Sequence, residues 1–249
     1  MKTFLVTLCI LMLTNITTGQ QLNEANRMLL LSKYEDAKRE IDKVFADAKA
    51  NDNPEALLLR VKIYAEIFYD SLLRAKYPDA GDESYRSLGK YIYKDPSLKS
   101  FFTGNGMRSL SIIYTEKFKE GYKLFTDGKW DAAFASFTVA EDLGDFIAKN
   151  GLGKNKQNID TVAVVYAGFA AQNAKKTDRA MFYYRKFAAE KIGGQDYIDI
   201  YRYLLYTTMV EKEADDFKKY LALARNLYPK EEVLWNAYEA EYKKKNPAW

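Results

Sequence analysis

The stretch DGKWDAAFASFTVA, Asp127 to Ala140, predicts a turn followed by a helix with one apolar face. Four residues stand at offsets of zero, three, seven and ten, which a period of 3.6 residues brings to one side of a helix: Trp130, Ala133, Phe137 and Ala140. Gly128 precedes them and suits the turn, because a residue without a β-carbon adopts a positive φ angle at no steric cost.

The same four offsets recur in three other segments, which are YEDAKREIDKV, TDRAMFYYRKF and ADDFKKYLALA. Their positions are Tyr34, Ala37, Ile41 and Val44; Thr177, Ala180, Tyr184 and Phe187; and Ala214, Phe217, Leu221 and Ala224. Of the sixteen positions only Thr177 is not apolar. A recurring pattern of this kind predicts a structural repeat rather than one isolated helix.

Two glycines strengthen the repeat. Gly121 lies nine residues before Trp130, and Gly168 lies nine residues before Thr177, each inside a preceding helical segment. Glycine inside a helix costs about 1 kcal/mol relative to alanine, so a packing reason is expected for it. We therefore expect a neighbouring helix to pack against the bare backbone at both glycines.

These residues resemble the tetratricopeptide repeat, a helix-turn-helix unit stacked into a superhelix. In that family the second helix opens with an aromatic and a small residue, as in Trp130 and Ala133, and closes with the same pair of types, as in Phe137 and Ala140. The best match runs from Lys117 to Phe187, and the match is degenerate elsewhere. The resemblance implies an all-α fold, a right-handed solenoid of stacked helix pairs.

Repeat lengths are expected to be irregular. From Ala133 to Ala180 is 47 positions and from Ala180 to Phe217 is 37, whereas the unit of the family has about 34. We expect a single solenoid domain over residues 20–249, with an uncertain or degenerate repeat near residues 55–105 and a capping helix near residues 231–245. A plain amphipathic helical bundle is the alternative, because any such bundle places apolar residues at helical spacings.

The first residues predict a secretory signal peptide. Lys2 precedes an apolar run from Phe4 to Leu13, which gives way to small and polar residues ending at Gly19. We expect residues 1–19 to be removed, with cleavage after Gln20 as the other possibility, and the protein to be exported by a bacterium to the periplasm or beyond. The only cysteine, Cys9, lies inside the apolar run and not at the cleavage point, so a lipoprotein is not expected. The mature chain is expected to have no transmembrane segment.

Composition excludes several kinds of chemistry. The chain has no histidine, which removes the usual catalytic triads and the common zinc sites. Its net charge of +4 is spread along the sequence, whereas nucleic-acid binding requires a clustered basic patch. Acidic pairs at Asp127 and Asp131, Asp215 and Asp216, and Glu231 and Glu232 stand at expected helix starts, where they offset the helix dipole. The segment NGLGKNK, from Asn150 to Lys156, lacks two residues of a phosphate-binding loop. We expect no catalytic residue, metal or cofactor.

The family resemblance also implies where partners bind, because the first helix of each unit lines a concave groove. Projected onto this sequence, the groove residues are Phe118, Tyr122, Phe125, Phe169, Gln172, Asn173, Arg202 and Tyr206. The favoured hypothesis is an exported adaptor that presents this aromatic groove to a peptide or partner protein of the cell envelope. A solute-binding protein for a glycan or peptide fragment is the alternative, and an enzyme is the third possibility. The sequence leaves the partner and the oligomeric state open.

Overall fold

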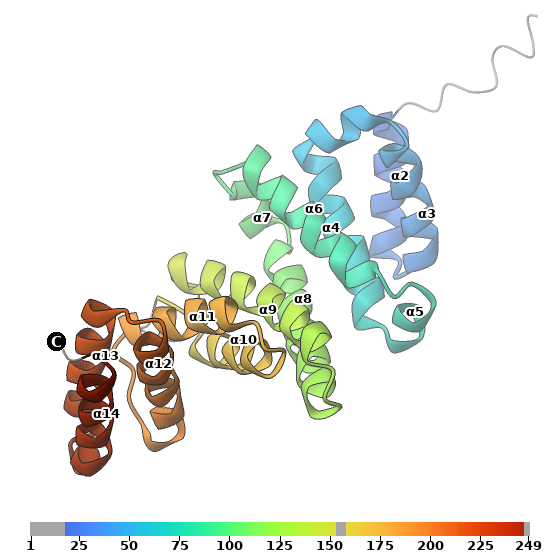
Figure 1. Ribbon diagram of the computed structural model, residues 1–249. Helices are drawn as coiled ribbons and strands as arrows, with labels where there is room; N and C mark the ends of the chain where they lie inside the picture. Colours follow the sequence, from blue (N-terminus) through green and yellow to red (C-terminus); the bar gives the residue numbers. More distant parts are fainter. Residues whose placement is uncertain (1–17, 153–157, 247–249) are drawn as a thin grey trace, which may run out of the picture. The chain divides into compact units, whose positions relative to one another are not determined.

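The computed structural model describes residues 18–152 and 158–246, and over these residues the chain forms thirteen α-helices and no strand (Figure 1). By its contacts the chain divides into two compact units, the first ending at Glu116 and the second beginning at Lys117. The division falls inside helix α8 (Gly106–Thr126). Each unit is described by itself, and the single solenoid domain stays a prediction. Residues 1–17 of the predicted signal peptide, Cys9 among them, lie outside the described residues, and Thr18 and Gly19 begin helix α2 (Thr18–Leu30).

Most of the helices form antiparallel pairs joined by short connections. In unit 1 the pairs are α2 (Thr18–Leu30) with α3 (Tyr34–Phe45), and α4 (Pro54–Tyr69) with α6 (Ala80–Lys94). In unit 2, α9 (Trp130–Lys149) packs against the part of α8 that precedes it, and the next pairs are α10 (Thr161–Asn173) with α11 (Thr177–Ala189) and α12 (Ile198–Val210) with α13 (Ala214–Leu227). The remaining elements are α5 (Ser71–Lys76), α7 (Lys99–Thr103), α14 (Glu232–Lys245) and the 3₁₀ turns Ala48–Asp52, Gln195–Tyr197 and Pro229–Glu231.

The sequence repeat corresponds to the second helix of four pairs. Helices α3, α9, α11 and α13 each begin at the first residue of the pattern. All twelve residues at the later offsets are buried, and none exposes more than 4% of its surface. An apolar stripe of this kind cannot be buried by one helix alone, so it fixes the side on which the partner helix packs. The all-α fold of stacked, tetratricopeptide-like helix pairs is therefore confirmed.

The two helical glycines make room for an aromatic ring, as expected. A β-carbon at Gly121 would stand 2.8 Å from the ring of Phe137, and one at Gly168 would stand 2.4 Å from the ring of Tyr184. Each ring lies sixteen residues after its glycine, at the third position of the repeat pattern. In the α2–α3 pair the corresponding residues are Ala25 and Ile41, and in the α12–α13 pair they are Leu205 and Leu221. Glycine therefore occurs where the side chain packed against it is an aromatic ring, and a larger residue occurs where that side chain is aliphatic.

The turns between paired helices share a backbone conformation that the sequence indicated only at Gly128. Ser32, Gly128, Lys175 and Lys212 have φ angles of 56°, 72°, 59° and 60°, and each stands two residues before the second helix begins. The next residue donates its backbone N–H over 2.9 Å to a carbonyl five residues earlier, as Lys129 does to Leu124. The same bond joins Lys33 to Met28, Lys176 to Ala171 and Glu213 to Thr208. This left-handed helix ending satisfies carbonyl groups that the last helical turn leaves free.

The shared turn conformation predicts that two substitutions change the stability in opposite directions. Gly128→Ala should lower the free energy of unfolding by about 1 kcal/mol, because a β-carbon is disfavoured at a left-handed φ. Lys175→Gly should raise it by up to about 1 kcal/mol, because it relieves the same strain in the next turn. Urea unfolding midpoints with unchanged slopes measure both effects. A loss of stability in both variants would contradict the equivalence of the turns.

The region around residues 55–105 contains another helix pair, with a longer connection. Helix α5 lies between α4 and α6, and Asp70 caps it by accepting two backbone N–H bonds. A β-carbon at Gly81 of α6 would stand 2.8 Å from the ring of Phe68 in α4, so here the glycine lies on the second helix and the ring on the first. The buried Ser84 hydroxyl donates to the carbonyl of Val61 over 2.7 Å. Helix packing is therefore retained, although the repeat pattern is not.

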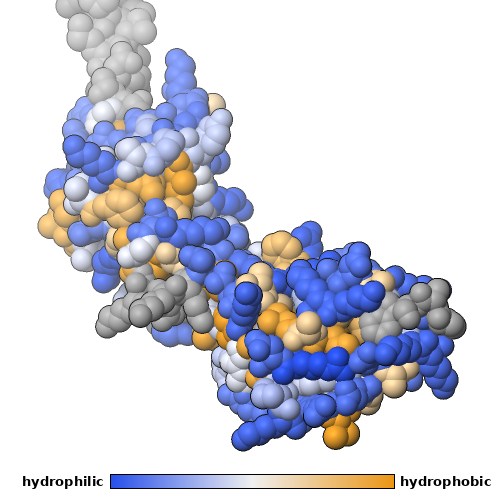
Figure 2. All heavy atoms as spheres, turned by 90° about the vertical axis from the view of Figure 1, so that its left-hand side faces the viewer, coloured by the Kyte–Doolittle hydropathy of each residue, from blue (hydrophilic) through white to orange (hydrophobic). Residues whose placement is uncertain are grey.

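Helix α14 occupies the residues for which a capping helix is expected. Its Trp235 is buried and donates from Nε1 to the carbonyl of Tyr228 over 3.0 Å, while Tyr242 stacks on Phe217 with ring centroids 4.0 Å apart. Val233, on the same helix, is exposed. In Figure 2 this end of the chain faces the viewer, and hydrophobic residues form a patch bordered by hydrophilic ones. Helix α14 thus covers α13 with one face and leaves its other face to solvent.

Candidate functional site

Three aromatic residues occupy one equivalent position in the first helices of unit 2. Tyr122, Phe169 and Tyr206 each follow directly after the residue that packs against the second helix, which is Gly121, Gly168 or Leu205. Tyr122 is 48% exposed, Tyr206 is 56% exposed and Phe169 is half-buried. Equivalent positions of stacked repeats line up along the stack. We call these three residues the aromatic row.

Two of the predicted groove residues have a packing role. Phe118 and Phe125 are partly buried in α8, and both contact the ring of Tyr166 in α10, with centroids 5.6 and 5.9 Å apart. Tyr122 touches the same ring at 5.7 Å but keeps nearly half of its surface in solvent. The sequence analysis did not select Tyr166. Tyr166 lies two residues before Gly168 in the sequence. This spacing places it on the side of α10 that faces the preceding helix pair, and it could have been used to predict the contact.

The predicted polar residues lie beside the aromatic row and are partly engaged within the protein. Gln172 accepts a hydrogen bond of 2.6 Å from the hydroxyl of the buried Tyr184. Burial raises the pKa of Tyr184, so this phenol stays protonated and remains a donor. The Asn173 amide donates to the carbonyl of Phe169 over 2.8 Å, and Arg202 pairs with Asp199 at 2.8 Å in an exposed contact. Arg202 also interacts with Tyr238, and its exposed ion pair to Asp199 is weak and can be exchanged for a partner's carboxylate.

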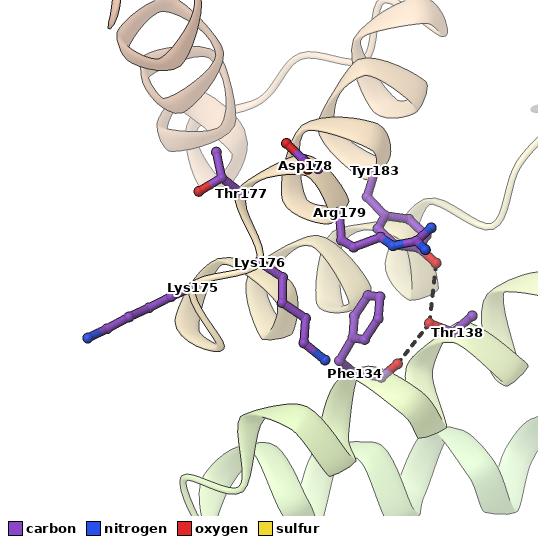
Figure 3. A pocket seen from close by; sticks show the side chains of 8 residues that line it. All are labelled: Phe134, Thr138, Lys175, Lys176, Thr177, Asp178, Arg179 and Tyr183. Atoms are coloured by element: carbon purple, nitrogen blue, oxygen red, sulfur yellow. Dashed lines mark hydrogen bonds between the residues drawn. The ribbon is translucent and has the colours of Figure 1, made fainter. Parts of the chain in front are cut away.

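A second feature of unit 2 lies on the second helices. A hollow of about 760 Å³ lies between α9 and the start of α11, and it is lined by Phe134, Thr138, Lys175, Lys176, Thr177, Asp178, Arg179 and Tyr183. Figure 3 shows Arg179 extending toward Tyr183 and Lys176 extending toward Phe134, whereas Lys175 points away. The Tyr183 hydroxyl lies 3.3 Å from that of Thr138, which ties the two helices together at the inner end of the hollow. None of the predicted groove residues lines this hollow.

A group of charged residues follows along the same two helices. Lys186 of α11 donates to Asp145 over 2.5 Å and also to Glu141, both in α9. Burial raises the pKa of Glu141, and the hydrogen bond from Lys186 opposes that rise. Burial by itself lowers the pKa of Lys186, but its hydrogen bonds to Asp145 and Glu141 outweigh burial and raise it. The group lines a second hollow of about 570 Å³ and holds α9 against α11.

Unit 1 has a polar cavity of about 750 Å³ beside α2 and α4. Its lining combines apolar Leu22, Leu58 and Leu59 with polar and charged groups, which are Asn23, Asn26, Asn53, Glu55, Lys62, Tyr91, Lys94, Asp95 and Ser100, and with Pro54. Burial lowers the pKa of Lys62. The sequence analysis did not find this cavity, because its residues come from four separate helical segments and follow no motif.

The acidic pairs have structural positions. Asp131, Asp215, Asp216 and Glu232 stand in the first turns of α9, α13 and α14, where carboxylates stabilise the helix start. Among the described residues there is no group of three or more carboxylate or thiol side chains able to hold a metal ion. Within the same residues, no helix combines the length and the apolar character that crossing a membrane requires. Most of the glycine-containing segment Asn150 to Lys156 lies outside the described residues.

Comparison with known proteins adds one structural similarity. No protein-family model matches the sequence, and no curated protein sequence matches it. Among solved structures, a crystal structure of PilW, described as a widely conserved type IV pilus biogenesis factor, is similar over 87% of this chain and 96% of its own. The sequence identity is 15% and the TM-score is 0.33. A TM-score of this size does not establish a common arrangement, so the fold assignment rests on the helix pairs themselves.

Proposed function

We propose that this protein is a non-enzymatic adaptor that binds a peptide or a partner protein on the first helices of unit 2. The aromatic row is the observation that carries the proposal. Each helix pair packs through the residue before the row and through the buried repeat positions. Although Tyr122 also contacts the ring of Tyr166, about half of the surface of Tyr122 and of Tyr206 stays exposed to solvent. Tyrosine is enriched at protein interfaces because its ring is apolar and its hydroxyl tolerates water.

The residues beside the row fit peptide recognition. Arg202 and Asn173 place a cation and an amide next to the aromatic positions, and both are exposed. A peptide in the groove would bury its side chains against the rings and use these groups for its carbonyl or carboxylate oxygens. Export from a bacterial cell and a partner in the cell envelope belong to the same proposal. Their support is the composition of the first nineteen residues.

The placement of the ionisable groups supports a non-enzymatic role. The carboxyl with a raised pKa, Glu141, is joined to Lys186 in a buried group that links two helices. Perturbed pKa values mark catalytic sites, but structural ion pairs also produce them. This group therefore supports a structural role.

Tyr122→Ala and Tyr206→Ala should each weaken partner binding by about tenfold, as expected when a side chain central to an interface is truncated. Both side chains are about half exposed, so the free energy of unfolding should change by less than about 1 kcal/mol. Tyr93→Ala is the matched control, because Tyr93 is 80% exposed and lies on α6 in unit 1. The measurement is isothermal titration with a partner identified by affinity capture. Equal affinities for the four proteins would contradict the proposal.

The alternative function, binding of a small solute, is favoured by one observation, the cavity of unit 1. Its volume of about 750 Å³ falls in the usual range of ligand sites. Mass spectrometry of molecules extracted from purified protein distinguishes the two functions. A bound glycan or peptide fragment, lost in Lys62→Met, would favour the alternative, and the absence of a co-purifying solute together with a captured protein would favour the adaptor.

A further inference from the structure

The second helices of unit 2 form a groove on a different set of elements from the aromatic row. Phe134 and Thr138 of α9 contact Tyr183 of α11, and further along both helices Glu141 and Asp145 contact Lys186. The contacts advance together along the two sequences, so α9 and α11 run in parallel. Tyr183 lines both hollows, which places them side by side. We call this continuous feature the α9–α11 groove.

One end of the α9–α11 groove is basic. Arg179 has no ion pair or hydrogen bond to any other residue that the structure describes, although its guanidinium reaches into the hollow (Figure 3). Lys176 pairs with Asp131 at 2.6 Å, and its ammonium lies 5.1 Å from the centre of the Phe134 ring. Because the Asp131 side chain is 77% exposed, this ion pair competes with water. This end therefore offers a guanidinium and an ammonium above an aromatic surface.

The other end is acidic. Three carboxylates, Glu141, Asp142 and Asp145, line the second hollow together with the two ammonium groups of Lys149 and Lys186. Only 8% of the surface of Asp145 is exposed, and its Oδ1 atom has no hydrogen-bond partner among the described residues. An unsatisfied buried carboxylate oxygen is costly, and a donor that reaches it is favourable. The exposed ring of Phe182 borders the same hollow and suits a cation.

We propose that the α9–α11 groove binds an extended peptide segment of a partner protein that carries one acidic and one basic residue, the acidic residue at Arg179 and Lys176 and the basic residue at Asp145 and Glu141. Charge complementarity favours such a peptide, because the groove has basic side chains at one end and acidic side chains at the other. A uniformly acidic or uniformly basic peptide would meet repulsion at one end. The proposal does not depend on the aromatic row.

The helix geometry sets the spacing of the two charges in the peptide. Arg179 and Lys186 are seven residues apart on α11, which at 1.5 Å per residue is about 10 Å. An extended peptide in the polyproline II conformation advances about 3.1 Å per residue and completes a turn every three residues, so that side chains three positions apart point to the same side. The acidic and basic residues should therefore be three positions apart, so that their side chains reach the two ends of the groove at the same time.

The test uses the full chain and fluorescein-labelled octapeptides, with fluorescence anisotropy at low ionic strength. The first peptide has glutamate and lysine three positions apart among alanines and one tyrosine, and the second has the same composition with the two charges adjacent. The first should bind at least fivefold more tightly. Arg179→Gln should weaken the first peptide about fivefold, and added salt should reduce the difference. Since Arg179 forms no ion pair or hydrogen bond with another described residue, this variant should fold normally, which circular dichroism checks.

Two further variants make the outcome decisive. Asp145→Asn should weaken the first peptide and strengthen the binding of an all-acidic peptide, because it removes a carboxylate that repels the acidic peptide. Arg202→Gln, which lies beside the aromatic row, reports binding at that other surface, and its effect on the first peptide should be clearly smaller than that of Arg179→Gln. The proposal is overturned if the adjacent-charge peptide binds equally well, if Arg179→Gln has no effect, or if Arg202→Gln weakens binding as much as Arg179→Gln. The last result would assign the peptide to the first helices instead.

Discussion

Lys186→Met should lower the free energy of unfolding at about pH 7 by roughly 3–5 kcal/mol, as expected when one partner of a buried ion pair is removed. The Lys186 side chain is 21% exposed, and those of Glu141 and Asp145 are 4% and 11% exposed. Methionine fills a similar volume without supplying a charge. The variant would therefore keep two buried carboxylates with no ammonium between them.

The pH dependence of this loss follows from the carboxyl pKa values. Burial already raises the pKa of Glu141, and removal of the Lys186 ammonium would raise it further. A carboxyl whose pKa is higher in the folded state stabilises the fold below its unfolded pKa, and this contribution disappears as the pH rises through the folded value. The deficit of Lys186→Met should therefore be small at about pH 4 and large at about pH 7.

Lys149→Met is the matched control. Lys149 lies 3.5 Å from the same Asp145 carboxylate, but its side chain is 68% exposed. An exposed pair contributes about 0–1 kcal/mol, so this variant should unfold almost as the parent protein does. Urea titrations of the three proteins at both pH values measure the effect. A deficit in Lys186→Met that is the same at both pH values would show that lost packing, and not the carboxylates, causes it.

Gly168→Ala should lower the free energy of unfolding by about 1–3 kcal/mol, because it overpacks a filled site. The new β-carbon would stand 2.4 Å from the Tyr184 ring, and Tyr184 is itself fully buried. Gly89→Ala is the control. Gly89 lies in helix α6 with open space around it, so that alanine should stabilise the helix by up to about 1 kcal/mol.

A second substitution tests whether the ring is the obstacle. Tyr184→Ile in the Gly168→Ala background reproduces the alanine and isoleucine found at the same positions of the α2–α3 pair, Ala25 and Ile41. The double variant should lose less stability than the sum of the two single variants. Additive losses would mean that the alanine acts through the helix backbone and not through the ring.

The sequence predicted the fold well because its information is local. The repeat offsets identify the buried stripe of one helix, and the glycine nine residues earlier identifies the ring that packs on it, as with Gly121 and Phe137. Both relations span fewer than twenty residues.

The candidate sites were less predictable for a physical reason. The α9–α11 groove joins residues more than forty positions apart, such as Glu141 with Lys186, and its depth depends on how far two second helices separate. The spacing of apolar residues in the sequence carries no information about the distance between two helices. The turns show a different limit, because Lys175 and Lys212 adopt a conformation typical of glycine. Backbone hydrogen bonds impose it, and these need no particular side chain.

The sixteen-residue separation between a helical residue and the side chain that packs against it has a consequence for how the chain acquires its structure. In four pairs this contact closes within a single helix-turn-helix segment, from Ala25 and Ile41 to Leu205 and Leu221. Contacts of such short range form quickly, because little chain entropy is lost in closing the loop. Each pair can therefore assemble as soon as its own segment has left the ribosome, in order from the amino end and without waiting for the carboxyl end.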